Sequence, residues 1–455
     1  MQNMQPERRM SKQLRSNEMT RVRQTNTMCL FMVAYLLSYI DRQILALLIG
    51  PIQSDLLLSD TQFACLNGLA FSLLYAILGF PLASMSDRYP RPPIIVGGVI
   101  LWSLATMACG LCNSFWSLFL CRVLVGLGEA ALAPAVYSYI ADTVPRERLA
   151  GTLAFFFLGS FLGSGCAFLF GGWLLAFVQQ HHFMILHAWQ ICFMVVGLPG
   201  IFLGIIIALT VHEPSCRIVP TKPVTASVAI SFFRNHSTFF SLHMFGYTLL
   251  AVTLFSLFSW MPAHMMRIHH MSHTELGLTL GVIVIVAGCG GAFTSGRLID
   301  ILTKRGIWYA PQLVASSAAF AASIPLVISV TTMNTHLAII SFSVAFFFAS
   351  FPMPPSATVL QIAVPASMRA RFSAAMLFCN AIGGLSGGSL LIGALNDHVF
   401  HSAASIGTSI ALVAGTASIL GGILLLLCIP SYRTLCNGQD RMERTSDMPA
   451  LQEMA

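Results

Sequence analysis

Charged residues are scarce in this chain. Asp, Glu, Lys and Arg make up 9% of its 455 residues, whereas 56% are hydrophobic and the mean hydropathy is +0.77. Soluble domains carry about 25% charged residues, so the composition excludes a water-soluble domain and predicts a polytopic membrane protein. The net charge of +7 is explained below by membrane orientation, so we do not expect nucleic acid as a partner.

Several sequence motifs are also missing. No Gly-x-x-x-x-Gly-Lys-Ser/Thr loop occurs, so we expect ion or solute gradients, not ATP, to supply any energy. The chain contains neither the His-Glu-x-x-His nor the Gly-x-Ser-x-Gly motif, so we expect no enzyme. We interpret the twelve cysteines as small packing residues, and the histidines have no spacing that favours a metal. We therefore expect no metal and no cofactor.

Long apolar runs recur along the chain and reach the ~18–25 residues that a membrane-spanning helix needs. These runs predict an all-α membrane protein with twelve transmembrane helices. The expected spans are 27–49, 62–84, 94–111, 116–138, 149–173, 188–211, 237–260, 276–298, 311–331, 336–357, 371–395 and 404–429.

Basic residues gather in both tails and in alternate loops, whereas Arg267 is isolated on the opposite side. Because positive charge favours the cytoplasmic side, we expect both termini to be cytoplasmic. We expect the protein to lie in the plasma membrane, or in the inner membrane of a bacterium, as a monomer.

The two halves repeat each other. Ser59-Asp-Thr-Gln62 and Ser272-His-Thr-Glu275 each predict a capping box at the start of a span. Duplicated six-helix halves are typical of transporters, so we predict two pseudo-symmetric bundles that rock around a central cavity. The predicted parts are an N-terminal tail at 1–26, a bundle at 27–211, a linker at 212–236, a bundle at 237–429 and a C-terminal tail at 430–455.

The second span of each half ends in the same pattern, which is a small residue, an Asp four positions later and then basic residues. This pattern resembles the loop signature of the major facilitator superfamily, although Ala83, Pro90 and Pro92 depart from it. We expect these side chains to lock two helices at the cytoplasmic side; ordinary loop charges are the alternative. The residues are Ala83, Asp87, Arg88 and Arg91 in the first half, and Gly296, Asp300, Lys304 and Arg305 in the second.

Asp41, Arg42, Arg122 and Glu129 lie inside predicted spans. At the bilayer centre each costs ~2.5–3.5 kcal/mol, so all four must face protein or a water-filled cavity. Neighbours on a helix diverge by ~100°, so Asp41 and Arg42 cannot easily pair with each other. We expect Asp41 to pair instead with Arg122, across two helices. Arg42 and Glu129 then remain for a ligand, a proton or each other, and a purely structural ion network is the alternative.

We expect these four residues to divide the work of transport. Arg42, and less strongly Arg122, are expected to bind the substrate anion. Glu129 is expected to carry the coupling proton, with Asp41 in a lesser role. In this hypothesis proton and anionic substrate compete for the same arginines.

Further motifs resemble bacterial members of the Spinster branch of that superfamily, over roughly residues 30–430. The resemblance implies proton-coupled or facilitated movement of lysophospholipids, sphingosine-type phospholipids or other amphipathic molecules. An organic-anion, sugar-acid or drug carrier and a non-transporting receptor are the alternatives. The motifs are Tyr39-Ile-Asp-Arg-Gln43, Ser59-Asp-Thr-Gln-Phe63, Phe115-Trp116, Cys121-Arg-Val-Leu-Val-Gly-Leu-Gly-Glu-Ala130, Ala141-Asp-Thr-Val-Pro-Arg-Glu-Arg148 and Trp260-Met-Pro-Ala263.

Overall fold

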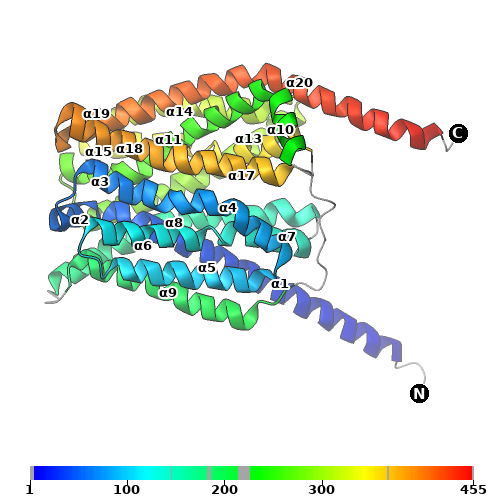
Figure 1. Cartoon of the computed structure of the whole chain (residues 1–455), viewed down its shortest axis with the longest axis horizontal. Helices are drawn as coiled ribbons and strands as arrows, with labels where there is room; N and C mark the ends of the chain where they lie inside the picture. Colours follow the sequence, from blue (N-terminus) through cyan, green and yellow to red (C-terminus); the bar gives the residue numbers. More distant parts are fainter. Residues whose placement is uncertain (1–4, 145, 182–185, 214–225, 366–367, 453–455) are drawn as a thin grey trace.

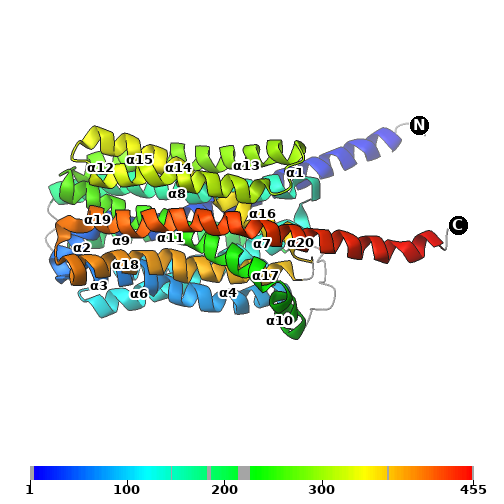
Figure 2. The same cartoon turned by 90° about the horizontal axis from the view of Figure 1, so that it is seen from above.

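The computed structural model describes residues 5–144, 146–181, 186–213, 226–365 and 368–452, and within these ranges it contains helices and no strand. Most helices lie side by side along one direction, and both chain ends emerge at the same end of the molecule (Figures 1 and 2). We call this the tail end and the opposite one the far end. The all-α prediction is confirmed.

All twelve predicted spans are confirmed, since each overlaps a helix long and apolar enough to cross a membrane. The first half contains α1 (Gln5–Leu47), α2 (Ile49–Leu56), α3 (Asp60–Ala64), α4 (Ala70–Arg88), α5 (Arg91–Cys109), α6 (Phe115–Glu129), α7 (Leu132–Thr143), α8 (Arg146–Gln180) and α9 (Ala188–Thr210). A π-helical turn, Cys65–Leu69, joins α3 to α4 within one span.

The second half begins with α10 (Ala226–Asn235), inside the predicted linker, of which residues 214–225 lie outside the described residues. It continues with α11 (Ser237–Ile268), α12 (His273–Ile283), α13 (Cys289–Lys304), α14 (Ala310–Thr331), α15 (Thr335–Ala349), α16 (Met353–Ala363), α17 (Arg369–Cys379), α18 (Gly388–Ala394), α19 (Ile406–Ile410) and α20 (Thr416–Gln452). Further π-helical turns are Val284–Gly288, Asn380–Gly387, Leu395–Phe400 and Ala411–Gly415, and Ala403–Ser405 forms a 3-10 turn.

Two prolines explain where spans break. A proline has no N–H to donate to the carbonyl four residues earlier. Pro51 therefore cannot bond Leu47, where α1 ends and α2 begins. Pro134 cannot bond Ala130, and the fourth span divides there into α6 and α7. The second break leaves Glu129 as the last residue of α6, in the interior of the span.

The helix caps follow the sequence in part. The capping box of Ser59 and Gln62 is confirmed. In the second copy, the Ser272 side chain accepts from the Glu275 N–H at 3.3 Å, but the reciprocal bond is missing. Helix ends also extend beyond the predicted spans: α11 runs to Ile268, and the eleventh span to Phe400.

The two halves approach each other closely at the far end. In Figure 1, α5, α6 and α9 lie on one side of the molecule and α11, α14 and α20 on the other. A Cβ at Gly68 would meet the Ser386 Cα at 2.9 Å, and a Cβ at Gly393 would meet the Asp60 carbonyl oxygen at 2.7 Å. Spans two and eleven therefore touch through their backbones.

Glycine contact also sets the position of α6 against α4. A Cβ at Gly126 would lie 2.1 Å from the Phe71 carbonyl oxygen, whereas a Cβ at Gly97 meets nothing within 4 Å.

We predict that Gly126→Ala destabilises the fold by about 1–3 kcal/mol because the helices must separate. Thermal unfolding of the purified protein should show this loss, with Gly97→Ala close to the parent. Equal midpoints in the two variants would contradict this packing.

Candidate functional site

The four charged residues predicted inside spans are all buried, with exposed fractions between 0% and 7%. Arg42 Nη2 donates to Glu129 Oε2 at 2.6 Å, and Ser38 Oγ donates to the same oxygen at 2.6 Å. Ser38 and Arg42 lie one turn apart on α1, so both reach the carboxylate at the end of α6. Sequence analysis left a ligand, a proton or each other as the partners of Arg42 and Glu129. In the structure the two residues bind each other.

Aromatic rings surround the Arg42 guanidinium. Its central carbon lies 4.2 Å from the ring centroid of Phe71, 4.6 Å from Tyr39 and 5.5 Å from Tyr75. Phe71 also lies 5.8 Å from the Arg122 guanidinium. Cation–π attraction strengthens away from water, so these rings help to hold two arginines in an apolar interior.

The expected side-chain pair of Asp41 and Arg122 is wrong. Arg122 Nη1 donates to the main-chain carbonyl of Asp41 at 3.1 Å, whereas the Asp41 carboxylate accepts from Thr106 Oγ1 of α5 at 3.2 Å. The two residues are nevertheless adjacent. The direction of the Asp41 side chain, toward α5, was not contained in the spacing.

Several polar atoms of this cluster lack a partner among the described residues. They are Arg42 Nε, Arg122 Nε and Nη2, and Glu129 Oε1. Buried polar atoms are nearly always bonded, so each exception needs an explanation. Guanidinium donors that remain free inside a buried cluster suit a carboxylate or phosphate, which guanidinium groups bind through paired donors.

An aromatic wall continues from the cluster toward the tail end of α1, and the sequence reasoning missed it. Tyr35 stacks on Phe156 with ring centroids 4.3 Å apart, and its hydroxyl lies 3.5 Å from that of Tyr39. Tyr137 meets Phe156 edge to face at 5.9 Å. Tyr35 and Tyr39, one helical turn apart and just before Asp41, were the signal available in the sequence.

A second polar cluster joins the two halves at the far end. Arg267 of α11 binds the Asp60 carboxylate through both terminal nitrogens, at 2.7 and 2.8 Å. Gln53 and Asn396 also donate to this carboxylate, at 2.8 and 2.9 Å. Paired, partly buried contacts of this kind are strong. We use the name far-end lock for Gln53, Asp60, Arg267, Asn396 and Asp397.

Asp397 completes the lock in the opposite sense. Its carboxylate accepts from the main-chain N–H groups of Asp60 and Thr61, at 3.2 and 2.7 Å. These N–H groups begin a helix and attract negative charge. Each half thus supplies a carboxylate to the other. The sequence reasoning missed the lock because Arg267 and Asp397 fell beyond the predicted span ends.

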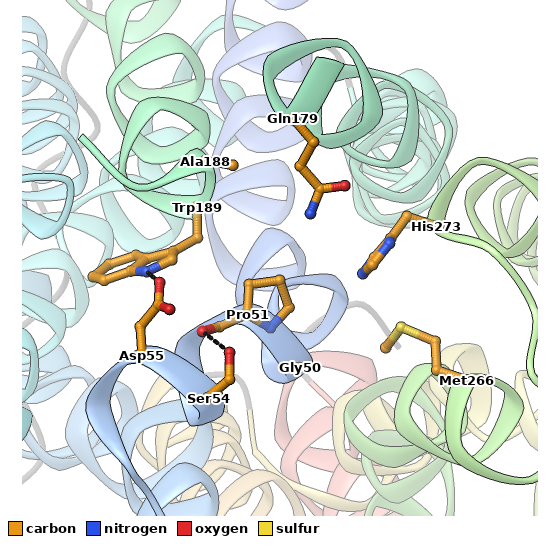
Figure 3. A pocket seen from close by; sticks show the side chains of 9 residues that line it. All are labelled: Gly50, Pro51, Ser54, Asp55, Gln179, Ala188, Trp189, Met266 and His273. Atoms are coloured by element: carbon orange, nitrogen blue, oxygen red, sulfur yellow. Dashed lines mark hydrogen bonds between the residues drawn. The ribbon is translucent and has the colours of Figure 1, made fainter. Parts of the chain in front are cut away.

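A pocket of ≈ 410 Å³ also lies at the far end, between residues of both halves (Figure 3). Asp55 at its edge accepts from Trp189 Nε1 at 2.7 Å, and the side chains of Gln179 and His273 point into the space. Neither the charged cluster nor the far-end lock contributes a residue to the lining of this pocket. Its lining is Gly50, Pro51, Ser54, Asp55, Gln179, Ala188, Trp189, Met266 and His273.

Among the described residues of the predicted gate at the tail end, none forms an ion pair across the halves. Arg91 binds Asp142 of its own half at 2.5 Å and Glu213 of the predicted linker at 3.1 Å. Asp300, Lys304 and Arg305 are exposed and take part in no ion pair of the described residues. The side chains of Asp87 and Arg88 lie outside the described residues. In this structure Arg91 thus contacts its own bundle and the predicted linker, and its role in the gate stays a prediction.

Comparison with known proteins fits this architecture. The family model of the Major Facilitator Superfamily matches residues 31–388. The chain belongs to this superfamily. It is therefore a multi-pass transporter, and the predicted resemblance to Spinster proteins is confirmed, since the chain is 25% identical to protein spinster homolog 1 of Xenopus tropicalis over 80% of this chain and 71% of that one.

The names of other relatives describe different transport activities. The chain is 28% identical to an MFS-type efflux pump of Mycolicibacterium smegmatis, over 87% of this chain and 90% of the relative. It is 26% identical to a probable L-galactonate transporter of Escherichia coli, over 81% and 82%. The crystal structure of a bacterial homologue of the human lysosomal transporter Spinster, inward-facing and unoccupied, shares the fold with a TM-score of 0.71, 24% identity, and coverage of 91% of this chain and 97% of that chain.

The far-end lock predicts a shift in conformation when its charge is removed. Asp60→Asn should weaken the closed far end by about 1–3 kcal/mol, because the partly buried Arg267 loses its charged partner. Spin labels at the exposed positions Leu111 and Met333, in different halves, should then report longer distances. Asp55→Asn is the matched control, since Asp55 binds Trp189 within one half. An unchanged distance distribution in Asp60→Asn would contradict the lock.

Proposed function

We propose that this transporter moves an anionic amphipathic small molecule, such as a lysophospholipid or a sphingosine-type phospholipid, together with protons. The contact of Arg42 and Ser38 with Glu129 carries the proposal. An arginine that can bind a substrate anion is held by a carboxylate that can also take a proton. In this proposal the Glu129 carboxylate thus links the proton to the substrate.

Charge balance gives the coupling its direction. Two arginines and two carboxylates cancel when all four are ionised, so a further anion is not favoured. A proton on Glu129 leaves one excess positive charge and releases Arg42 from its partner. The substrate therefore competes with the Glu129 carboxylate, and the proton assists substrate binding. This reverses the sequence-based hypothesis that proton and substrate compete.

Arg122 and Asp41 take supporting roles in this proposal. Arg122 keeps two nitrogens without partners among the described residues, and it lies near the same Phe71 ring as Arg42. It can therefore bind a second oxygen of the same headgroup. Asp41, held by Thr106, balances the charge of Arg122 when no substrate is bound.

The aromatic wall supports an amphipathic substrate. Tyr35, Phe156 and Tyr137 extend apolar surface from the charged cluster, where an acyl or sphingoid chain attached to a bound headgroup can pack. The rings nearest to Arg42 come from the first half.

The proposed alternating access uses one gate at each end of the molecule. We propose that the closed far-end lock faces outward and that the tail end faces the cytoplasm, as the basic tails and loops favour. In the opposite state the lock opens, and Asp87, Arg88, Asp300, Lys304 and Arg305 close the tail end. Their exposure in the second half fits a gate that is open.

A sugar-acid carrier is the second candidate, because relatives include a hexuronate transporter of Bacillus subtilis, 22% identical over 64% of this chain. A sugar acid offers the same anion to Arg42 but no apolar chain to the aromatic wall. Uptake by proteoliposomes under an acid-outside gradient separates the two. We expect uptake of an anionic lysophospholipid; uptake of galactonate alone would favour the second candidate.

Glu129→Gln tests the coupling in the same proteoliposomes. The amide mimics the neutral acid, so we expect exchange of labelled substrate to persist while an imposed pH gradient no longer increases uptake. Glu275→Gln, an exposed carboxylate at the far end, is the control and should respond as the parent does. Full gradient-driven uptake by Glu129→Gln would leave the cluster with a structural role.

A further inference from the structure

We propose that Cys112 and Cys121 are a thiol pair that forms a reversible disulfide at the far end of the molecule. Their sulfurs lie 3.6 Å apart, and both residues are reduced in the structure. The sequence reasoning treated all cysteines as packing residues, because Cys121 lies nine positions after Cys112 and no spacing marks them as a pair.

Local structure brings the thiols together. Cys109 ends α5, Cys112 lies in the short connection that follows, and Cys121 is in the second turn of α6. Gln190 of α9 fixes the connection by donating to the Cys112 carbonyl oxygen at 2.9 Å.

Position favours oxidation at this place. Cys112 is buried, but its neighbours Leu111 and Asn113 are exposed, so a small oxidant approaches from the far end. The proposed orientation puts that end outside the cytoplasm, where disulfides persist. The biological setting thus rests on the proposed function, whereas the chemistry of the pair does not.

The reaction balances with a hydroperoxide as oxidant. One sulfur attacks the peroxide oxygen, forming a sulfenic acid and releasing water. The second sulfur then attacks the sulfenic sulfur, the S–S bond forms, and a second water leaves with the thiol proton. Two thiols are oxidised by two electrons in total, and one H₂O₂ is reduced to two waters.

The rate should depend on pH. The hydrogen bond with Cys121, and then burial, raise the pKa of the Cys112 thiol. Because the thiolate is the reactive form, oxidation should be slow at neutral pH and faster as pH rises. The disulfide would fix α6 to the end of α5 directly beside Arg122, so it would restrain one of the two buried arginines.

Mass spectrometry of the purified full chain tests the pair. Reduced protein is treated with H₂O₂, its remaining thiols are alkylated after denaturation, and it is digested with chymotrypsin, which cuts between Cys112 and Cys121 at Phe115 and Trp116. We expect a linked peptide pair, a loss of two thiols and recovery of both with reductant. Cys192→Ser, a buried thiol of α9, should behave as the parent.

Cys121→Ser should lose the linked pair and the two-thiol loss while keeping the thermal midpoint of the parent. Twelve alkylated thiols in peroxide-treated parent protein would overturn the proposal, as would a link that joins other cysteines. Because the measurement uses no substrate and no membrane orientation, its failure is distinct from failure of the proposed transport function.

Discussion

The contact between Arg42 and Glu129 is the constraint on which the site depends. Four charged residues inside spans would cost roughly 10 kcal/mol if they faced lipid, so the first half is built around them. Pro134 ends α6 at Glu129, and Gly126 lets α4 approach closely enough for Phe71 to lie between the two arginines. Small changes in helix packing therefore alter charge pairing directly.

The far-end lock complements this cluster. It joins the halves through charged groups at helix ends, where some water reaches them, and the exposed fraction of the Arg267 side chain is 22%. Such pairs separate at lower cost than fully buried ones. In the proposed cycle the lock opens while the cluster, the proposed substrate site, stays buried, as alternating access requires.

Much of the architecture follows from the sequence, because hydropathy and positive charge act over whole helices. The twelve spans and the burial of Asp41, Arg42, Arg122 and Glu129 were predictable in this way. Pairing was not: Asp41 contacts Thr106 because of side-chain direction, which spacing leaves open. Arg267 and Asp397 were missed because helix ends are the least certain part of a span prediction. Arg91 was predicted as a gate residue, but its partners Asp142 and Glu213 were not, because they lie far away in the sequence.

Proton uptake on substrate binding tests the central claim most directly. Purified protein in lipid nanodiscs, in weakly buffered solution near neutral pH with a pH indicator, is mixed with an anionic lysophospholipid. If the substrate displaces the Glu129 carboxylate from Arg42, about one proton is taken up per molecule bound, and none by Glu129→Gln. Binding without proton uptake in the parent would contradict a site shared by proton and substrate.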